Sequence, residues 1–109
     1  MAFTSDVVVV DYPLQNVTVQ SPLTVTGRAV GNWFFEASFP IEVVALDGTV
    51  LGRNFVQAQD EWMTTDFVPF VGQIIFDSQG YSSGFIIFHK DNPSGLPEHD
   101  ASRKMPVNF

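Results

Sequence analysis

The stretch Leu23-Thr-Val-Thr-Gly-Arg-Ala-Val30 decides the fold. Its apolar residues Leu23, Val25 and Ala29 stand at odd positions, and polar side chains stand between them. Successive side chains of an extended chain point to opposite faces, so this alternation predicts a strand with one face in a core. The Ser-Pro pair at residues 21–22 suits the start of a strand, where a proline removes no ladder hydrogen bond.

Runs with the same period of two recur between turn signals, and almost nothing has helical periodicity. Further strands are expected at residues 7–11, 17–19, 39–46, 50–58, 67–76, 85–89 and 102–109. Asp47-Gly48 predicts a hairpin, and Pro69 inside its run predicts a bulge or an edge. Seven to eight short, mostly antiparallel strands in a chain of this length predict an all-β fold, an immunoglobulin-like β-sandwich.

The composition suits a single domain with an aromatic core. Of the 109 residues 45% are hydrophobic and 16% are charged, so residues 1–109 are expected to form one packed domain. Eleven residues are phenylalanine, which buries a large area and favours strands. The chain has no cysteine, which excludes disulfides, thiolate metal sites and thiol nucleophiles.

The charge balance narrows the range of partners. Twelve acidic and five basic residues give a formal net charge of −7. Nucleic-acid binding depends on lysine and arginine that neutralise phosphates, so no nucleic-acid partner is expected. The apolar runs are too short to span a bilayer, so no membrane insertion is expected, and the start of the chain does not resemble a signal peptide.

Three stretches of the sequence, taken together and in order, indicate a family resemblance. They are residues 21–29 with the following Trp33-Phe-Phe-Glu-Ala-Ser-Phe-Pro, then Trp62-Met-Thr-Thr-Asp-Phe-Val-Pro-Phe, then residues 91–101. In this order they resemble the immunoglobulin-like domain of bacterial spore germination proteins, a family also found in bacterial lipoproteins and envelope proteins. The resemblance extends from about Val7 to Phe109. It implies an accessory binding domain in an extracytoplasmic, cell-envelope context, with no catalytic residue.

The first candidate binding residues are Phe34 and Glu36. If residues 33–39 are extended, Phe34 and Glu36 share the face opposite Trp33. The Phe34 ring would then stack on a sugar or a peptide, and the Glu36 carboxylate would accept hydrogen bonds. The structural alternative makes Glu36 an acceptor for nearby backbone N–H groups.

Two further segments are candidates for contact with a partner. Trp62 and Met63 follow an acidic loop, and tryptophan is favoured at binding hot spots because it joins a large apolar area to one donor. The alternative is that Trp62 closes one end of the sandwich. In the loop at residues 91–97, Asn92, Ser94, Leu96 and Pro97 form the other candidate surface, because Asn, Pro and Gly specify an ordered turn. The alternative is that this loop is purely structural and only joins two strands of the sandwich.

The spacing of the polar residues does not indicate a metal site, a cofactor site or a catalytic site. One acidic cluster comprises Asp60, Glu61 and Asp66, and a second comprises Asp91, Asn92, Glu98 and Asp100. Neither has the spacing of a calcium loop, and the two histidines, ten residues apart, do not suggest zinc. Ser94 lacks the glycine two residues before it that a nucleophile elbow needs. No metal, no cofactor and no enzymatic activity are therefore expected.

The sequence thus predicts a non-catalytic binding domain of a bacterial envelope or spore-germination-related protein. The expected partner is a protein, with cell-wall glycan as the second choice. A carbohydrate-binding module needs a solvent-facing row of aromatics, for which Trp62, Tyr81 and Phe34 are available. A proteinase inhibitor would need a projecting loop at residues 93–97, and a structural spacer would need no binding surface at all.

Overall fold

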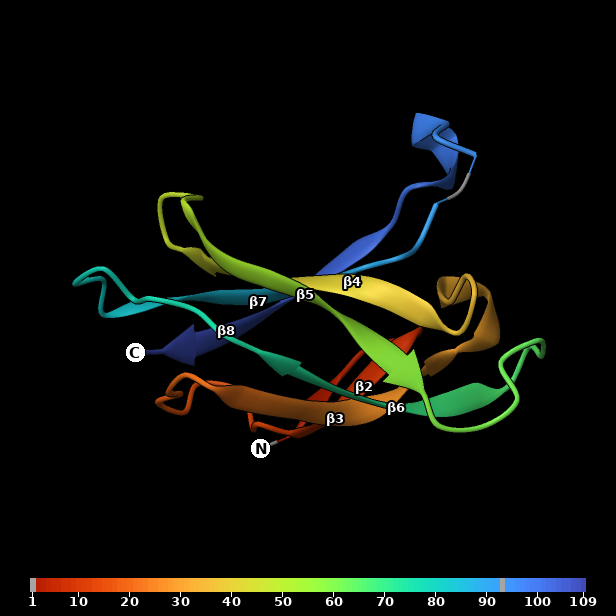
Figure 1. Ribbon diagram of the computed structural model, residues 1–109, viewed down its shortest axis with the longest axis horizontal. Helices are drawn as coiled ribbons and strands as arrows, with labels where there is room; N and C mark the ends of the chain where they lie inside the picture. Colours follow the sequence, from red (N-terminus) through yellow and green to blue (C-terminus); the bar gives the residue numbers. More distant parts are fainter. Residues whose placement is uncertain (1, 93) are drawn as a thin grey trace.

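The computed structural model describes residues 2–92 and 94–109, apart from the side chain of His99. Its elements are strands and two short 3-10 helices (Figure 1). The strands are β1 (Phe3–Thr4), β2 (Val8–Tyr12), β3 (Leu23–Val30), β4 (Ser38–Ala45), β5 (Val50–Ala58), β6 (Phe67–Ile74), β7 (Ser83–His89) and β8 (Ser102–Asn108). The helices are η1 (Gly31–Trp33) and η2 (Pro97–His99). No helix in the described part of the chain has the length and apolarity needed to cross a membrane.

The strands form one hydrogen-bonded sheet in the order β1-β2-β3-β6-β5-β4-β7-β8, with antiparallel neighbours. Strands β5 and β6 pair through only two residue pairs, Gln57 with Val71 and Ala58 with Phe70. The sheet folds over at this short junction, so β3 and β6 lie in one layer and β4, β5 and β7 in the other (Figure 1). The predicted all-β, immunoglobulin-like sandwich is confirmed.

The core between the layers is built on aromatic rings, as the phenylalanine content predicts. The Phe39 ring makes edge contacts with three others, at centroid distances of 5.9 Å to Trp33, 5.1 Å to Phe34 and 5.2 Å to Phe70. Phe88 continues the cluster at 6.2 Å from Phe70. Every side chain classed as buried in the described residues is hydrophobic. Offset and edge-to-face contacts of this kind add to the stabilisation that comes from buried area.

The segment between β3 and β4 corrects the predicted extended run. Residues 31–33 form η1, and the left-handed backbone of Glu36 (φ 51°) and Ala37 (φ 65°) then reverses the chain. Phe35 and Ser38 exchange backbone hydrogen bonds of 2.9 and 3.2 Å across this turn. Strand β4 therefore begins at Ser38, and the assumed alternation of faces from residue 33 is wrong.

Two smaller expectations also need correction. Residues 17–19 are not a strand of the sheet; Thr18 makes an isolated parallel bridge to Asn108, which ties this segment to the edge of β8. Pro69 pairs with Arg28 in an unbroken register, so there is no bulge. The strand is not an edge of the sheet either, since β6 lies between β3 and β5 and the Pro69 carbonyl accepts the Gln59 N–H at 2.8 Å, one residue before the β5 pairing begins at Phe70.

Candidate functional site

Three loops meet at one end of the sandwich and are called here the three-loop end: residues 31–37, 59–66 and 90–101 (right-hand side of Figure 1). The Gly31 N–H donates to the Asp66 carbonyl at 3.1 Å, and the Asp91 N–H donates to the Trp33 carbonyl at 3.0 Å. The first loop is therefore bonded to both of the others. All eight predicted binding residues lie in these loops, so the fold brings three separate sequence segments together.

Phe34 does not take the exposed position predicted for it. Its side chain is 3% exposed and packs against Phe39, so the ring cannot stack on a ligand. The neighbouring Phe35, 41% exposed, faces solvent instead, because the turn after η1 exchanges the two positions. Glu36 is exposed, and the structural and binding interpretations of its carboxylate both remain predictions.

The second loop places Trp62 and Met63 in different environments. Met63 is 76% exposed, whereas Trp62 is partly buried and packs against the core cluster. The loop lies tightly on the first one, since a Cβ atom at Gly31 would collide with the carbonyl oxygens of Trp62 and Thr64. Glycine at position 31 therefore allows the two loops to touch. Trp62 is thus placed between the two predictions made for it: it packs on the core, as a residue that closes the sandwich would, but it is not fully buried, so part of it is available to a partner.

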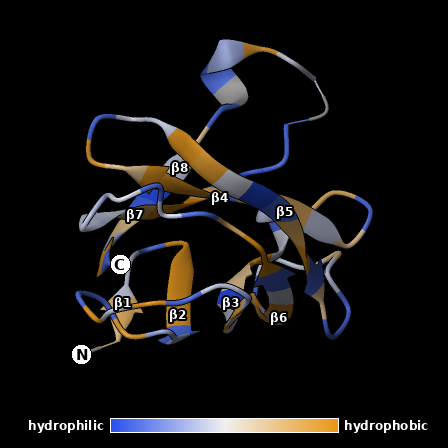
Figure 2. Cartoon of the chain, turned by 60° about the vertical axis from the view of Figure 1, so that its left-hand side comes forward, coloured by the Kyte–Doolittle hydropathy of each residue, from blue (hydrophilic) through white to orange (hydrophobic). Residues whose placement is uncertain are grey.

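The third loop projects from the body of the molecule and carries η2 at its tip (Figure 2). Asn92 organises it: its carbonyl accepts the Gly95 N–H, its side-chain amide donates to the Leu96 carbonyl at 2.9 Å, and its Oδ1 accepts the Ser94 hydroxyl at 2.6 Å. Leu96 is exposed, and Pro97 occupies the first turn of η2. The predicted order of the loop is confirmed for these residues, while Pro93 lies outside the described part.

The three-loop end holds most of the negative charge. Its loops contain seven of the twelve acidic residues: Glu36, Asp60, Glu61, Asp66, Asp91, Glu98 and Asp100. Lys90 is the only lysine or arginine in them. Burial raises the pKa of Asp91, and the Glu36 carboxylate adds to this effect, while a hydrogen bond from the Asn92 backbone opposes it. The Glu36 and Asp91 carboxylates, from the first and third loops, therefore repel each other.

The chain matches the family model of the immunoglobulin-like domain of bacterial spore germination over residues 7–95. It belongs to this family. Neither curated proteins nor solved structures give a significant match. The family match includes the first two loops of the three-loop end and ends inside the third. The spore germination immunoglobulin-like domain is typically a non-catalytic accessory domain.

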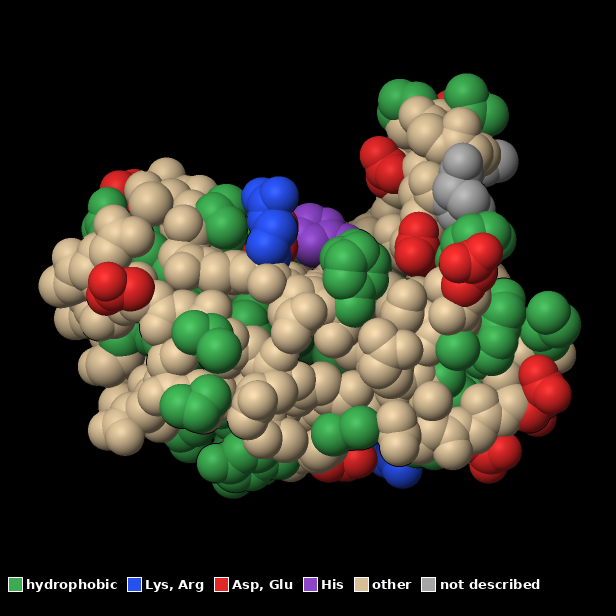
Figure 3. All heavy atoms as spheres, viewed as in Figure 1, with side chains coloured by type: hydrophobic (Ala, Val, Ile, Leu, Met, Phe, Trp, Pro, Cys, Tyr) green, Lys and Arg blue, Asp and Glu red, His purple; other side chains and the backbone are tan. Residues whose placement is uncertain are grey.

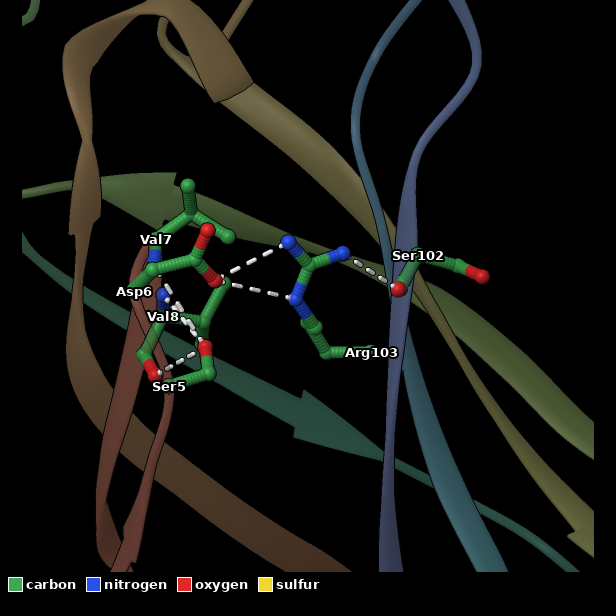
Figure 4. Close-up of polar contacts among 6 residues, drawn as sticks. All are labelled: Ser5, Asp6, Val7, Val8, Ser102 and Arg103. Carbon is green, nitrogen blue, oxygen red and sulfur yellow. Dashed lines mark hydrogen bonds and ion pairs between the residues drawn. The ribbon is translucent and has the colours of Figure 1, made fainter.

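One cation close to the three-loop end of this spore germination domain is already paired. The Arg103 guanidinium donates to Asp6 Oδ1 through Nη2 at 3.0 Å and Nε at 3.3 Å, and through Nη1 to the Ser102 carbonyl at 2.8 Å (Figure 4). The same group lies 5.9 Å from the Trp33 ring centroid. The hydrogen bond from Arg103 lowers the pKa of Asp6. Arg103 therefore joins β8 to the N-terminal segment, and its ion pair is with Asp6 and not with a carboxylate of the three loops.

The acidic residues of the loops do not converge on a metal site. Among the described residues, no group of three or more histidine, cysteine, aspartate or glutamate side chains is arranged to hold a metal ion. Carboxylates that are dispersed in this way act through their summed field instead.

The raised pKa of Asp91 predicts a pH-dependent stability. A carboxyl group whose folded-state pKa is raised stabilises the fold only while it is protonated, so this contribution is lost as the pH rises through the folded pKa. Asp91→Asn should therefore raise the melting temperature at pH 7. The gain should vanish near pH 3, where the Asp91 side chain of the wild type is protonated and thus as neutral as the asparagine of the variant. Thermal unfolding at the two pH values measures this.

Asp47→Asn is the matched control, because its shift has the opposite sign. The Thr49 backbone N–H at 2.9 Å holds the pKa of Asp47 below its usual value, and the Tyr81 hydroxyl, at 2.8 Å, contributes to this. Its stabilisation is present above the unfolded pKa and is lost on acidification, so Asp47→Asn should lower the melting temperature at pH 7. If the melting temperatures of Asp91→Asn and Asp47→Asn at pH 7 both changed in the same direction and by the same amount, the expected electrostatic effects would be contradicted.

Sequence reasoning did not find a second feature, a groove on the outer face of the layer containing β4, β5 and β7. The groove has a volume of about 570 Å³, and Pro40, Glu42, Arg53, Phe55 and His89 line it. Phe55 and His89 lie 34 positions apart in the sequence and become neighbours only through the pairing of β5 with β4 and of β4 with β7. The alternation of apolar and polar residues along each strand indicated which side chains face outward. It did not indicate which strands lie next to one another in the sheet.

Proposed function

We propose that this spore germination domain is a non-catalytic, extracytoplasmic binding module whose three-loop end recognises a protein with a basic and partly apolar surface. The observation that supports this most is the coincidence of seven carboxylates with exposed apolar side chains, namely Phe35, Met63 and Leu96. Apolar groups at the centre of an interface supply affinity, while complementary charge steers and orients the partner. The family relationship supports the envelope context.

The acidic field argues for a cationic partner surface. Six net negative charges lie in three short loops (seven acids and one lysine), against −7 for the whole chain. A charge concentrated in this way raises the association rate of an oppositely charged partner, and salt screens the effect. An acidic protein or an anionic polymer would be repelled at the same end.

The projecting third loop supports a second candidate function, that of a proteinase inhibitor. Its tip is exposed and is ordered by the Asn92 hydrogen bonds, and such pre-organisation favours insertion into a protease cleft. An equimolar amount of the domain should then inhibit a secreted serine protease without being cleaved. Cleavage of the loop without inhibition would rule this function out.

The interaction test uses the immobilised domain and an envelope extract. The wild type should retain a protein that Met63→Ala and Leu96→Ala retain about tenfold less well, because each removes an exposed apolar contact. Retention should also weaken as sodium chloride is raised, since screening removes the electrostatic attraction. The retained fraction is quantified by mass spectrometry.

Ile75→Ala is the matched control, because Ile75 is 74% exposed but lies outside the three loops. This variant should retain the same protein as the wild type. If Met63→Ala and Ile75→Ala retain it equally, the three-loop end is not the contact surface.

A further inference from the structure

We infer that the outer face of the layer containing β4, β5 and β7 is a second binding site, and that it takes a neutral oligosaccharide of extended shape. This site adjoins the three-loop end, with which it shares Lys90 and Asp100 at the base of the third loop, and it carries none of the eight residues predicted from the sequence. The inference rests on the direction of the groove, the hydrogen bonds that fix its side chains, the pairing of its backbone and its balanced charge.

The groove runs across the strands. Phe55 on β5 pairs with Pro40 on β4, and His89 on β7 pairs with Ser102 on β8. The register of β4 with β7, in which Ile41 pairs with Phe88, places Pro40 beside His89. Neighbouring strands are about 4.8 Å apart, so this row crosses roughly 14 Å from the first strand to the fourth.

A second hollow extends the groove along the same row. It has a volume of about 510 Å³ and lies over His89, Lys90, Asp100 and Ser102, beneath the third loop. The two hollows share His89. Figure 3 shows the notch between the body of the molecule and the projecting loop, with hydrophobic, basic and histidine side chains beside one another at its floor. An extended ligand fits this shape better than a single small ring does.

The polar side chains of the groove are held in place before any ligand arrives. Glu42 is the centre: its Oε1 lies 2.7 Å from His89 Nε2, and its Oε2 accepts a hydrogen bond from Arg53 Nη2 at 3.0 Å. The Arg53 side chain is 70% exposed, whereas that of Glu42 is 18% exposed. Phe55, 50% exposed, supplies a ring at one end of the row. A ring platform beside fixed donors and acceptors suits a sugar, which has an apolar C–H face and a rim of hydroxyl groups.

The backbone beneath the groove cannot recognise a peptide by strand addition. Strand β4 is paired with β5 on one side and with β7 on the other, and β7 is paired with β4 and β8. Peptides that bind sheets commonly use free edge N–H and C=O groups, which β4 and β7 at the centre of the groove lack. Recognition must come from side chains, by stacking and by hydrogen bonds to peripheral groups.

The charge in the groove favours a neutral ligand. Among its lysine, arginine, aspartate and glutamate side chains, Arg53 and Lys90 balance Glu42 and Asp100. The whole chain carries −7, which repels anionic polymers. An uncharged chain of hexose or hexosamine units brings no charge into the balanced groove, and the net negative charge of the domain does not repel it.

Titration with two defined sugars tests the inference. We expect cellotetraose or the β-linked N-acetylglucosamine tetramer to bind with a dissociation constant of roughly 1 mM or lower, by calorimetry. Amide chemical shifts should change in β4, β5 and β7. Phe55→Ala should weaken binding at least tenfold because it removes the platform, and Phe55→Trp should preserve binding because it keeps one.

Phe67→Ala is the matched control, since Phe67 has similar exposure but begins β6 in the other layer. It should bind sugar as the wild type does, and so should Met63→Ala, which separates this result from the test of the three-loop end. Failure of both sugars to shift the groove amides would overturn the inference, as would wild-type binding by Phe55→Ala. A peptide that shifts those amides when neither sugar does would show a peptide groove and would also overturn it.

Discussion

Trp33→Ala should lower the free energy of unfolding by about 3–5 kcal/mol, the range for emptying a buried aromatic site. Trp33 is 2% exposed and makes an edge contact with Phe39, the ring on which the core cluster is centred. The substitution also removes the aromatic face beneath Arg103, whose guanidinium lies 5.9 Å from the ring centroid. Because Trp33 ends η1, the loss is expected to loosen the three-loop end as well as the core.

Urea denaturation followed by circular dichroism measures this change, since two-state unfolding allows the free energy to be compared between variants. Trp33→Phe is the conservative control and should cost clearly less, because a ring remains in the site. A loss below about 1 kcal/mol for Trp33→Ala would show that the site does not need the indole, and the proposed link between core and loops would fail.

The strands were predictable where the pattern was local. In β3 the alternation of apolar and polar residues agrees with the observed burial, because one face of the strand packs into the core and the other does not. The Asp47-Gly48 turn falls between β4 and β5 as the hairpin signal requires, and Gly48 has the positive φ of 92° that such a turn uses. Local geometry was sufficient in both cases.

The region after β3 shows where this reasoning fails. Its aromatic run suits a strand by propensity, yet the chain turns at two residues that are not glycine, Glu36 and Ala37. No residue type at those positions signals a left-handed conformation. The consequence reaches the candidate site directly, because Phe34 becomes core and Phe35 becomes surface.

The sequence identified the candidate segments, but it did not predict that they lie next to one another in the fold. The sequence identified Trp62, Met63 and the Asn92 loop as separate candidates, but it did not show that η1 would join both through the Gly31 and Trp33 backbone. The groove around Phe55 was missed altogether, since it depends on the order of β5, β4 and β7. Strand order is set by contacts between distant residues, which a period of two does not encode.

The two proposed surfaces differ in the physics of recognition. The three-loop end offers concentrated charge and exposed apolar tips, so its binding should respond strongly to salt. The groove of the sheet face offers balanced charge around a ring, so its binding should not. Measuring both interactions over the same range of sodium chloride therefore separates them without any mutation.

Trp62→Ala should weaken the complex with the protein retained by the three-loop end by about 2 kcal/mol or more, the usual threshold for a hot spot. Trp62 is partly buried against the core, beside the exposed Met63, so it can present indole area to a partner from a fixed position. The domain itself should remain folded, with a loss of stability below the roughly 3–5 kcal/mol expected for Trp33→Ala.

The two tryptophans allow a direct optical measurement, because Trp33→Phe leaves Trp62 as the only indole in the chain. In that background, iodide should quench the Trp62 fluorescence partially in the free domain and much less in the complex, since the partner covers the ring. The affinity is then obtained by titrating the partner and following the same signal. If Trp62 is fully shielded from iodide in the free domain and Trp62→Ala unfolds it, Trp62 closes the end of the sandwich, and contact with the partner must come from Met63 and Leu96 alone.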